Sequence, residues 1–264
     1  MKKQKKIGLI GAGNMGGAIL DGIYRDFGIF VAEADKDRAL ELQKKYKVEL
    51  GGIKDVVGQT DIIILAVKPQ LFEEVLTDLK GHITKDHLVI SIAAGIKTSF
   101  IQRKLGKDIR VIRTMPNLPV QVKEGMTGVC FGKTVKRTDV ILACQIFNAI
   151  GQTVVVEEKK IDALTAISGS GPAYLFYVVE CLEKAAKSLG LKPDVAQQLI
   201  VQTLSGSLKL LQESPEDAKT LRKRVTSKGG TTQAALEVFE AVKTDKIFRE
   251  ALKAARDRAK ELSK

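Results

Sequence analysis

A glycine-rich turn near the amino terminus constrains the fold of this chain more than any other feature. The motif Gly11-Ala12-Gly13-Asn14-Met15-Gly16 follows an apolar run at residues 6–10 and opens a helical segment. The tight turn needs Gly11, a pyrophosphate can approach the backbone only over a bare Gly13, and Gly16 lets the helix lie close on its strand. The helix N-terminus adds unpaired N–H groups and a positive dipole end. The order strand, glycine turn, helix therefore predicts a dinucleotide-binding site.

Apolar runs alternate with helical segments through the first half of the chain. The runs at 28–33, 61–67, 88–92 and 109–113 predict strands, and the run at 61–67 is typical of a strand buried on both faces. A short strand near Val48 and two further strands at 126–131 and 153–156, with a helix at about 135–149, are also expected. The alternation predicts an α/β fold: a Rossmann-like, doubly wound parallel sheet whose ligand crevice lies at the carboxyl ends of its strands.

An acidic residue follows the second strand, where this fold discriminates between cofactors. Glu33 lies 22 residues beyond Gly11, and such an acid accepts hydrogen bonds from the ribose hydroxyls of the adenosine. That arrangement favours NADH, because the carboxylate repels a 2′-phosphate. Asp35 could play the same part, and Lys36 or Arg38 could meet a phosphate. Both NADH and NADPH therefore remain open, with the sequence favouring NADH.

Small residues follow the next strands at the same edge of the predicted sheet. The strand at 61–67 ends in Ala66-Val67 and continues into Lys68-Pro69, and the turn Ala93-Ala94-Gly95 comes after the strand at 88–92. The small residues at 93–95 would let a flat ring approach, and we expect residues 66–69 to border the cofactor as well.

Beyond Glu157 the apolar residues take a helical spacing throughout, which predicts two domains: a dinucleotide-binding domain at 1–158 and an all-helical domain at 159–264. Two glycine loops interrupt the helical part. One is Ser168-Gly169-Ser170-Gly171-Pro172, and the other, at 226–232, carries Gly229 and Gly230 ahead of a helix expected at 233–242. The second loop suits a small anion such as a carboxylate, although simple helix capping explains the same spacing.

Composition excludes several other classes of protein. Lys and Arg exceed Asp and Glu by 43 to 31, but the charges are interleaved along the chain, which indicates a solvated basic surface and no nucleic-acid partner. With two histidines, and with Cys130, Cys144 and Cys181 in apolar runs, we expect buried free thiols and no metal site. The absence of a run of about 18 apolar residues predicts a cytoplasmic protein without a membrane partner.

Taken together, the motifs resemble those of the pyrroline-5-carboxylate reductase family over essentially the whole chain. They are residues 10–16, 66–70, 91–95, 113–117, 168–174 and 229–232. The resemblance implies hydride transfer from the C4 of NADH or NADPH to the C=N carbon of a cyclic imine carboxylate, giving proline. It also implies a homodimer that interlocks through its C-terminal helices, and dimers that assemble into a decamer.

The resemblance also assigns roles to residues. It places the substrate carboxylate on the backbone of Gly229, Gly230 and Thr231, and gives the hydroxyl of Thr232, the catalytic residue, the ring nitrogen. Glu216 and Asn117 match further positions of the substrate site.

Several residues depart from the family pattern. Lys228 stands where proline is usual, Lys223 where an acid is usual, and Leu118 where threonine is usual, so their effect on substrate preference stays open. The run Glu33-Ala34-Asp35 replaces an asparagine, an arginine and a serine that often receive the 2′-phosphate, and Ile53 replaces an asparagine, which again favours NADH.

Two alternative functions share this layout. A β-hydroxyacid dehydrogenase would need a lysine about three residues into the helix after the serine-glycine turn, whereas the first lysine here is Lys184. A non-catalytic nicotinamide-nucleotide-sensing protein would keep residues 11–16 but would not need the second glycine loop.

Overall fold

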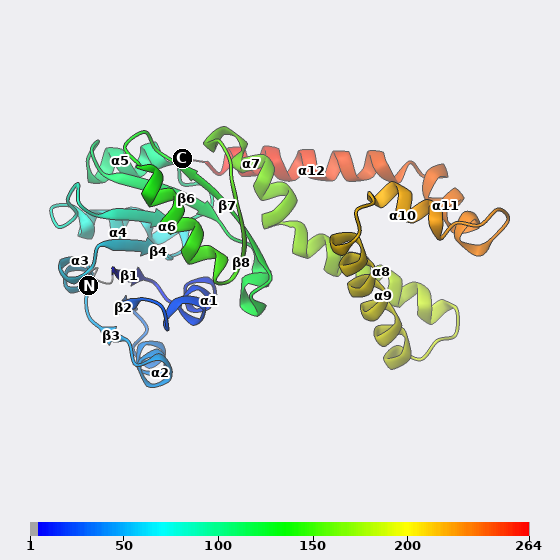
Figure 1. Cartoon of the computed structure of the whole chain (residues 1–264), viewed down its shortest axis with the longest axis horizontal. Coiled ribbons are helices and arrows are strands. Elements are labelled where there is room, and N and C mark those ends of the chain that lie inside the picture. Colours follow the sequence, from blue (N-terminus) through cyan, green and yellow to red (C-terminus); the bar gives the residue numbers. More distant parts are fainter. Residues whose placement is uncertain (1–4, 264) are drawn as a thin grey trace. The chain divides into compact units, whose positions relative to one another are not determined.

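The computed structural model describes residues 5–263, and its first part is built on one eight-stranded sheet (Figure 1). The strands lie in the order β3-β2-β1-β4-β5-β6-β7-β8, so the chain winds outward from β1 in both directions. Their bounds are β1 Lys6–Ile10, β2 Gly28–Ala32, β3 Glu49–Leu50, β4 Ile62–Leu65, β5 Leu88–Ser91, β6 Arg110–Met115, β7 Gly125–Phe131 and β8 Gly151–Val155. The first six strands are all parallel, which confirms the predicted Rossmann-like winding.

The last two strands correct the expectation of a wholly parallel sheet. β7 pairs antiparallel with β6, and β8 pairs parallel with β7. Only residues 116–124, which include the 3-10 helix η2 (Leu118–Val122), connect β6 to β7. A parallel crossover needs a dozen or more residues, so a connection of this length returns the chain in the opposite direction. Thr114 and Met115, expected in the turn, are the last residues of β6.

Helices cover both faces of the sheet, because alternate side chains of each buried strand point to opposite sides. Ile62 and Ile64 face one apolar cluster, and Ile63 and Leu65 face the other. The first cluster is completed by α1 (Asn14–Ile23), α2 (Lys36–Tyr46) and α6 (Arg137–Asn148). The second is completed by α3 (Ile53–Gln59), which the sequence analysis missed, α4 (Phe72–Leu79) and α5 (Thr98–Leu105). Helices thus cover the two faces of the sheet, on either side of the carboxyl ends of β1 and β4.

The helical part, residues 171–254, forms a second compact unit, whereas residues 1–170 and 255–264 form the first. The domain boundary at residue 158 stays a prediction. After β8, and still within the first unit, the chain passes through η3 (Glu158–Lys160), α7 (Ile161–Leu164) and the π-helical turn η4 (Thr165–Gly169). The remaining helices are α8 Gly171–Ser188, α9 Pro193–Glu213, α10 Ala218–Arg224, α11 Thr231–Ala241 and α12 Thr244–Glu261.

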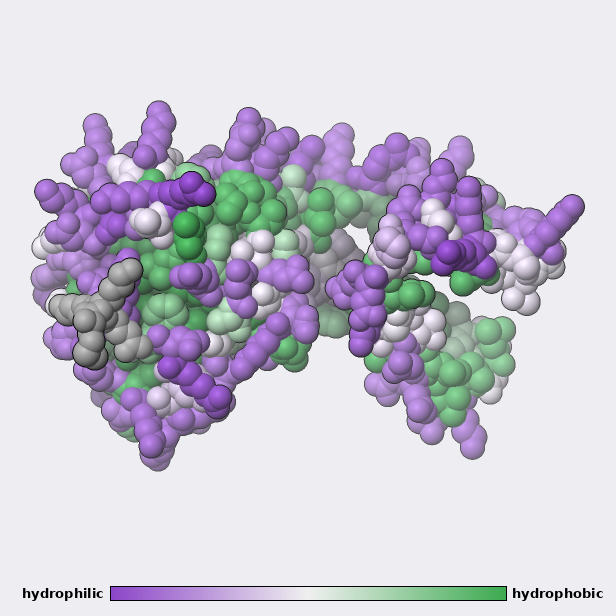
Figure 2. Space-filling view, in the orientation of Figure 1, coloured by the Kyte–Doolittle hydropathy of each residue, from purple (hydrophilic) through white to green (hydrophobic). Residues whose placement is uncertain are grey.

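The second unit buries almost none of its apolar side chains. Among the described residues of this unit, the buried hydrophobic ones are Ala186 and Ala196, while large apolar side chains of α8 and α9 are about half exposed. Figure 2 shows green, hydrophobic side chains at the surface of this unit. Cys181 of α8 is exposed and Cys144 half-buried, so the expectation of buried thiols is right only for Cys130. Cys181 is exposed because α8 turns an apolar side outward, and exposed apolar patches of this kind mark sites of protein–protein contact.

The carboxyl end of the chain returns to the first unit. There the carbonyl oxygen of Leu262 lies against Gly95, where an added Cβ would be 2.5 Å from it. Ser263 Oγ donates a hydrogen bond to Asp162 Oδ1 at 3.3 Å. In the described part of the chain, no helix is long and apolar enough to cross a membrane.

Candidate active site

The three motif glycines have three different environments, and each fits one role in dinucleotide binding. Gly11 has φ +86°, and a Cβ there would lie 2.8 Å from Val67 Cγ1. A Cβ at Gly16 would lie 2.3 Å from the carbonyl oxygen of Gly11, so the helix packs directly on the turn. A Cβ at Gly13 would meet no described atom within 4 Å. The protein itself therefore does not need a glycine at 13, and the space above it is open to a ligand.

A cavity of about 620 Å³ opens beside this turn at the carboxyl edge of the sheet. Its volume is in the range typical of small-molecule sites. Six of the residues predicted to bind the cofactor line it: Gly11, Gly13, Glu33, Ala66, Val67 and Lys68. Leu71 and Val75 add an apolar wall, on which a flat base can lie. The residues present thus fit a dinucleotide, with the N-terminus of α1 facing the phosphates.

The Glu33 carboxylate is held in place by the glycine turn. Its Oε2 accepts a hydrogen bond of 2.6 Å from the N–H of Ala12, and its Oε1 accepts one of 3.1 Å from the N–H of Asp35. Arg38 donates from Nε to the carbonyl oxygen of Ala12 at 3.3 Å. Asp35, the alternative ribose partner, instead caps α2 by accepting from the N–H of Arg38 at 3.0 Å. Of the two acids that follow β2, Glu33 is therefore the one that lines the cavity.

The remaining predicted cofactor residues lie in the same unit but outside the cavity lining. Ala12 is buried beneath the turn, whereas Asn14, Met15, Gly16 and Pro69 continue the two helices that start there. Ala93 and Gly95 are buried and Ala94 is exposed in the turn after β5. Because β5 pairs with β4, this turn lies one strand along the same carboxyl edge from the Ala66–Pro69 turn.

The threonine loop belongs to the second unit and precedes α11. Gly229 has φ +72°, and its N–H donates to Gln233 Oε1 at 2.8 Å. The N–H of Gly230 donates to the carbonyl oxygen of Ser227 at 3.1 Å. Both glycine N–H groups are therefore engaged within the loop. The donors that point out of the helix end are those of its first turn, which begins with Thr231 and the half-buried Thr232.

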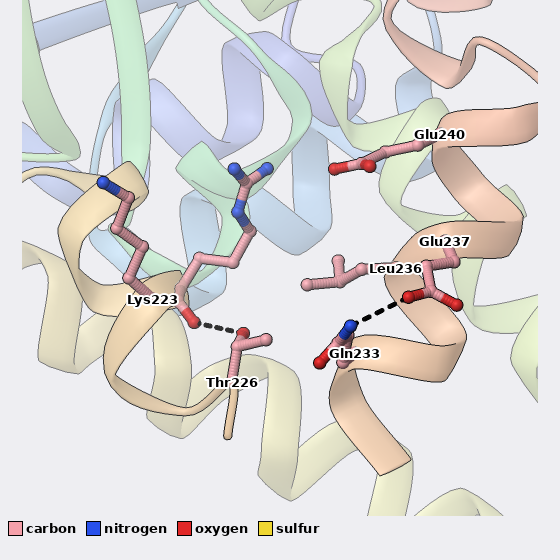
Figure 3. Close-up of a pocket in the computed structure, with 7 residues that line it drawn as sticks. Lys223, Thr226, Gln233, Leu236, Glu237 and Glu240 are labelled. Carbon is pink, nitrogen blue, oxygen red and sulfur yellow. Dashed lines mark hydrogen bonds between the residues drawn. The ribbon is translucent and has the colours of Figure 1, made fainter. Parts of the chain in front are cut away.

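Glu216 acts on this loop through an ion pair. Its Oε1 lies 2.8 Å from Nη2 of Arg224, the last residue of α10, directly before the loop. Beside the loop, α10 and α11 enclose a pocket of about 350 Å³, shown in Figure 3. Lys223 and Thr226 come from one wall, and Gln233, whose Nε2 donates to Glu237 Oε1 at 2.9 Å, comes from the other. Lys223, a departure from the family pattern, thus lines this pocket together with Arg222 and two acids.

Some residues of both sites were missed by sequence reasoning. Glu74 and Asp78 of α4 line the dinucleotide cavity, and their spacing of four residues on one helix face was a usable signal. Arg224 had no signal of its own, because its role depends on the position of Glu216 in space.

The comparisons with known proteins fit this geometry. The family model described as pyrroline-5-carboxylate reductase dimerisation matches residues 158–262, and the model described as NADP oxidoreductase, coenzyme F420-dependent, matches residues 6–95. Pyrroline-5-carboxylate reductase 2 of Bacillus subtilis is 39% identical over 256 residues, which cover 94% of this chain and 90% of that protein. The chain belongs to the pyrroline-5-carboxylate reductase family. The resemblance found in the sequence motifs is thereby confirmed, as is the assignment to the NAD(P)H-dependent oxidoreductases.

Solved structures of this family share the whole fold. A pyrroline-5-carboxylate reductase from Coxiella burnetii has a TM-score of 0.94 at 38% identity and covers 99% of this chain and 100% of its own. The Plasmodium falciparum pyrroline carboxylate reductase with NADP bound has a TM-score of 0.86 at 29% identity, with 98% of both chains covered. A nicotinamide dinucleotide is therefore the cofactor class of the family, and the match to the dimerisation model indicates a homo-oligomer.

Proposed function

We propose that this chain reduces 1-pyrroline-5-carboxylate to L-proline and that it takes its reducing equivalents from NADH in preference to NADPH. The observation that carries the proposal is the glycine turn, whose Gly13 leaves open space for a ligand beside the dinucleotide cavity, in a chain that belongs to this family over nearly its full length.

The chemistry asks little of the protein beyond orientation. The bound reduced nicotinamide supplies a hydride to the C=N carbon, and a protonated imine nitrogen becomes the amine of proline. Holding two reactants in register contributes a large part of such a rate enhancement, so no acidic or basic catalyst of strongly shifted pKa is required. Ala66, Val67 and Lys68 line the dinucleotide cavity, and the small residues of the Ala93–Gly95 turn on the neighbouring strand suit the approach of a flat ring.

The substrate half of the reaction is assigned to the threonine loop. The N–H groups of Thr231 and Thr232 at the start of α11, with the positive end of the helix dipole, bind the substrate carboxylate. The Thr232 hydroxyl makes a hydrogen bond to the ring nitrogen. Gly229 and Gly230 shape the loop around it, because a Cβ at Gly230 would lie 2.3 Å from Ser227 Oγ. Glu216 holds Arg224 by their ion pair and so fixes the end of α10, from which the chain enters the loop.

The preference for NADH is inferred from Glu33. Its carboxylate is positioned by two backbone N–H groups before any cofactor arrives, and two further carboxylates, Glu74 and Asp78, line the same cavity. Lys68 is the cation among the described residues that line it. A ribose with free hydroxyls can donate to Glu33, whereas a 2′-phosphate adds about two negative charges to an acidic cavity.

We further infer that two copies of the chain form a homodimer through their C-terminal helices and that these dimers assemble into a decamer. We also infer that the protein is located in the cytoplasm. The exposed apolar side chains of α8 and α9 support the dimer: Phe176 is 53% exposed and Leu199 is 52% exposed, too much apolar surface for a helical unit that stands alone.

The decisive experiment is a spectrophotometric assay at 340 nm that pairs NADH or NADPH with pyrroline-5-carboxylate and with its six-membered analogue. We expect turnover of the five-membered imine, with a higher kcat/KM for NADH. Tight NADH binding without turnover of either imine would favour the sensing protein instead, and a strong preference for NADPH would contradict the role of Glu33.

A further inference from the structure

The π-helical turn η4, residues 165–169, lies on the carboxyl end of β6. The N–H of Ser170 donates to the carbonyl oxygen of Thr165 at 2.9 Å, which gives the wide i to i+5 turn. Gly169 lies against Met115, the last residue of β6, since an added Cβ would be 2.9 Å from Met115 Cε. π-helical turns are rare and are frequently found at functional sites.

Asn117 supplies such contacts. Its Nδ2 donates to the carbonyl oxygen of Ser168 at 3.2 Å and lies 3.3 Å from Ser168 Oγ, while its Oδ1 accepts from the N–H of Met126 at 2.8 Å. The half-buried amide thus joins the end of β6, the start of β7 and the π turn. Both ends of the amide are engaged within the chain, so Asn117 is poorly placed to be a direct ligand of the substrate.

The location of this turn connects it to the reaction. β6 pairs with β5, and Thr114 Oγ1 donates to the carbonyl oxygen of Ser91 at 3.1 Å, immediately before the Ala93–Gly95 turn. In a sheet wound in this order, the β1–β2 half holds the adenosine and the β4–β6 half holds the nicotinamide. The π turn is therefore at the nicotinamide half of the carboxyl edge.

We propose that Asn117 is a positioning residue for hydride transfer: it fixes the π turn against the end of β6 and so shapes the wall beside the nicotinamide. This inference rests on the proposed reductase activity. Loss of the amide donor lets Ser168 move away from β6, which misaligns the reacting groups without removing a contact to the cofactor phosphates. The effect is thus expected in kcat and not in the affinity for NADH.

The test compares N117D with N117A over pH 6 to 9. In N117D the ionised carboxyl can still accept from Met126 but cannot donate to the Ser168 carbonyl. An ordinary aspartate has a pKa of about 4 and is ionised throughout this range, so we expect kcat of N117D to fall about tenfold or more below that of the unmodified protein at every pH. N117A, which also lacks the donor, should show a comparable loss. The matched control N148D makes the same change at an exposed residue of α6 and should leave the rates unchanged.

Two readouts that do not depend on turnover complete the test. The Kd for NADH, measured by fluorescence, should change less than about twofold in each variant, and the amide of Ser170 should exchange its hydrogen faster in N117A, as the π turn loosens. A raised KM for the imine with unchanged kcat in both variants would show a direct substrate contact and overturn the proposal, as would unchanged exchange at Ser170. Failure of the unmodified protein to reduce the imine would refute the proposed function instead, and the exchange experiment would still decide the role of Asn117.

Discussion

Replacing Glu33 by glutamine should shift the cofactor preference toward NADPH. The substitution keeps the length of the side chain and an oxygen that can accept from the N–H of Ala12, so the glycine turn should keep its conformation. It removes the negative charge that the structure places at the edge of the dinucleotide cavity. The substitution also replaces Oε1, which accepts from the N–H of Asp35, by an NH2 group that cannot accept, so a weakening common to both cofactors is expected beside the change in the electrostatic interaction with the 2′ position of the ribose.

The magnitude follows from Coulomb's law. A phosphate of charge about −1.7, roughly 5 Å from the carboxylate, is repelled by roughly 1.5 kcal/mol at the dielectric constant of water and roughly 6 kcal/mol at that of a protein surface. Glu33 is half-buried and the phosphate can move away, so the lower value applies. We expect the KM for NADPH to fall about tenfold in E33Q, and the KM for NADH to rise a few-fold, because a charge-assisted hydrogen bond to the ribose becomes neutral.

The assay is steady-state kinetics with each cofactor at low and high ionic strength, with E124Q as the matched control. Glu124 is exposed directly before β7 and does not line the cavity, so its replacement changes the net charge equally. An E33Q enzyme whose ratio of kcat/KM for the two cofactors stays within about twofold of the original would refute the reasoning. An equal shift in E124Q would show that overall charge, and not Glu33, sets the preference.

Three further predictions concern other parts of the chain. T232A should lower kcat/KM for the imine by at least about tenfold, about 1.4 kcal/mol, while T232S keeps the hydroxyl and most of the activity; equal kinetics of both variants would remove Thr232 from the site. Changing Leu199 and Leu208, each about half exposed, to lysine should yield monomers in analytical ultracentrifugation, whereas L40K, equally exposed in the first unit, should not; a dimer that survives both changes would place the interface elsewhere. Burial, with a smaller effect of Glu158, raises the pKa of the Cys130 thiol to about 12, so the unfolded chain loses this proton first as the pH rises. The free energy of unfolding should therefore fall between about pH 9 and 12 by up to about 1.4 kcal/mol per pH unit, and C130A, compared by urea unfolding, should lack that part of the slope.

The features that the sequence predicts well are those with a local physical cause. Gly11, Gly13 and Gly16 each meet one local need: a tight turn, room for a pyrophosphate, and close packing of the helix. The open space over Gly13 agrees with the second of these. The run at 61–67 is apolar on both faces because β4 has helices on both sides of it. Such features need no knowledge of distant parts of the chain.

The features that escaped prediction depend on contacts between distant residues. The direction of β7 follows from how the connection at 116–124 closes, and no residue type specifies the i to i+5 turn at 165–169. The role of Asn117 at the substrate stays a prediction, but its motif carries no sign that the amide would donate to residue 168, 51 positions later. Likewise, the hydrogen bond from the Gly229 N–H to Gln233 Oε1 could not be predicted, because it depends on where the first turns of α11 place the Gln233 side chain.

The return of the chain's end to the sheet has a practical consequence. Leu262 and Ser263 lie against Gly95 and Asp162, so a purification tag or a display partner attached after them would emerge next to a turn proposed to border the cofactor. β1 starts at the opposite edge of the sheet, at Lys6, and an extension there leaves the carboxyl edge clear. Researchers who immobilise this protein for binding measurements should therefore attach it by its amino end.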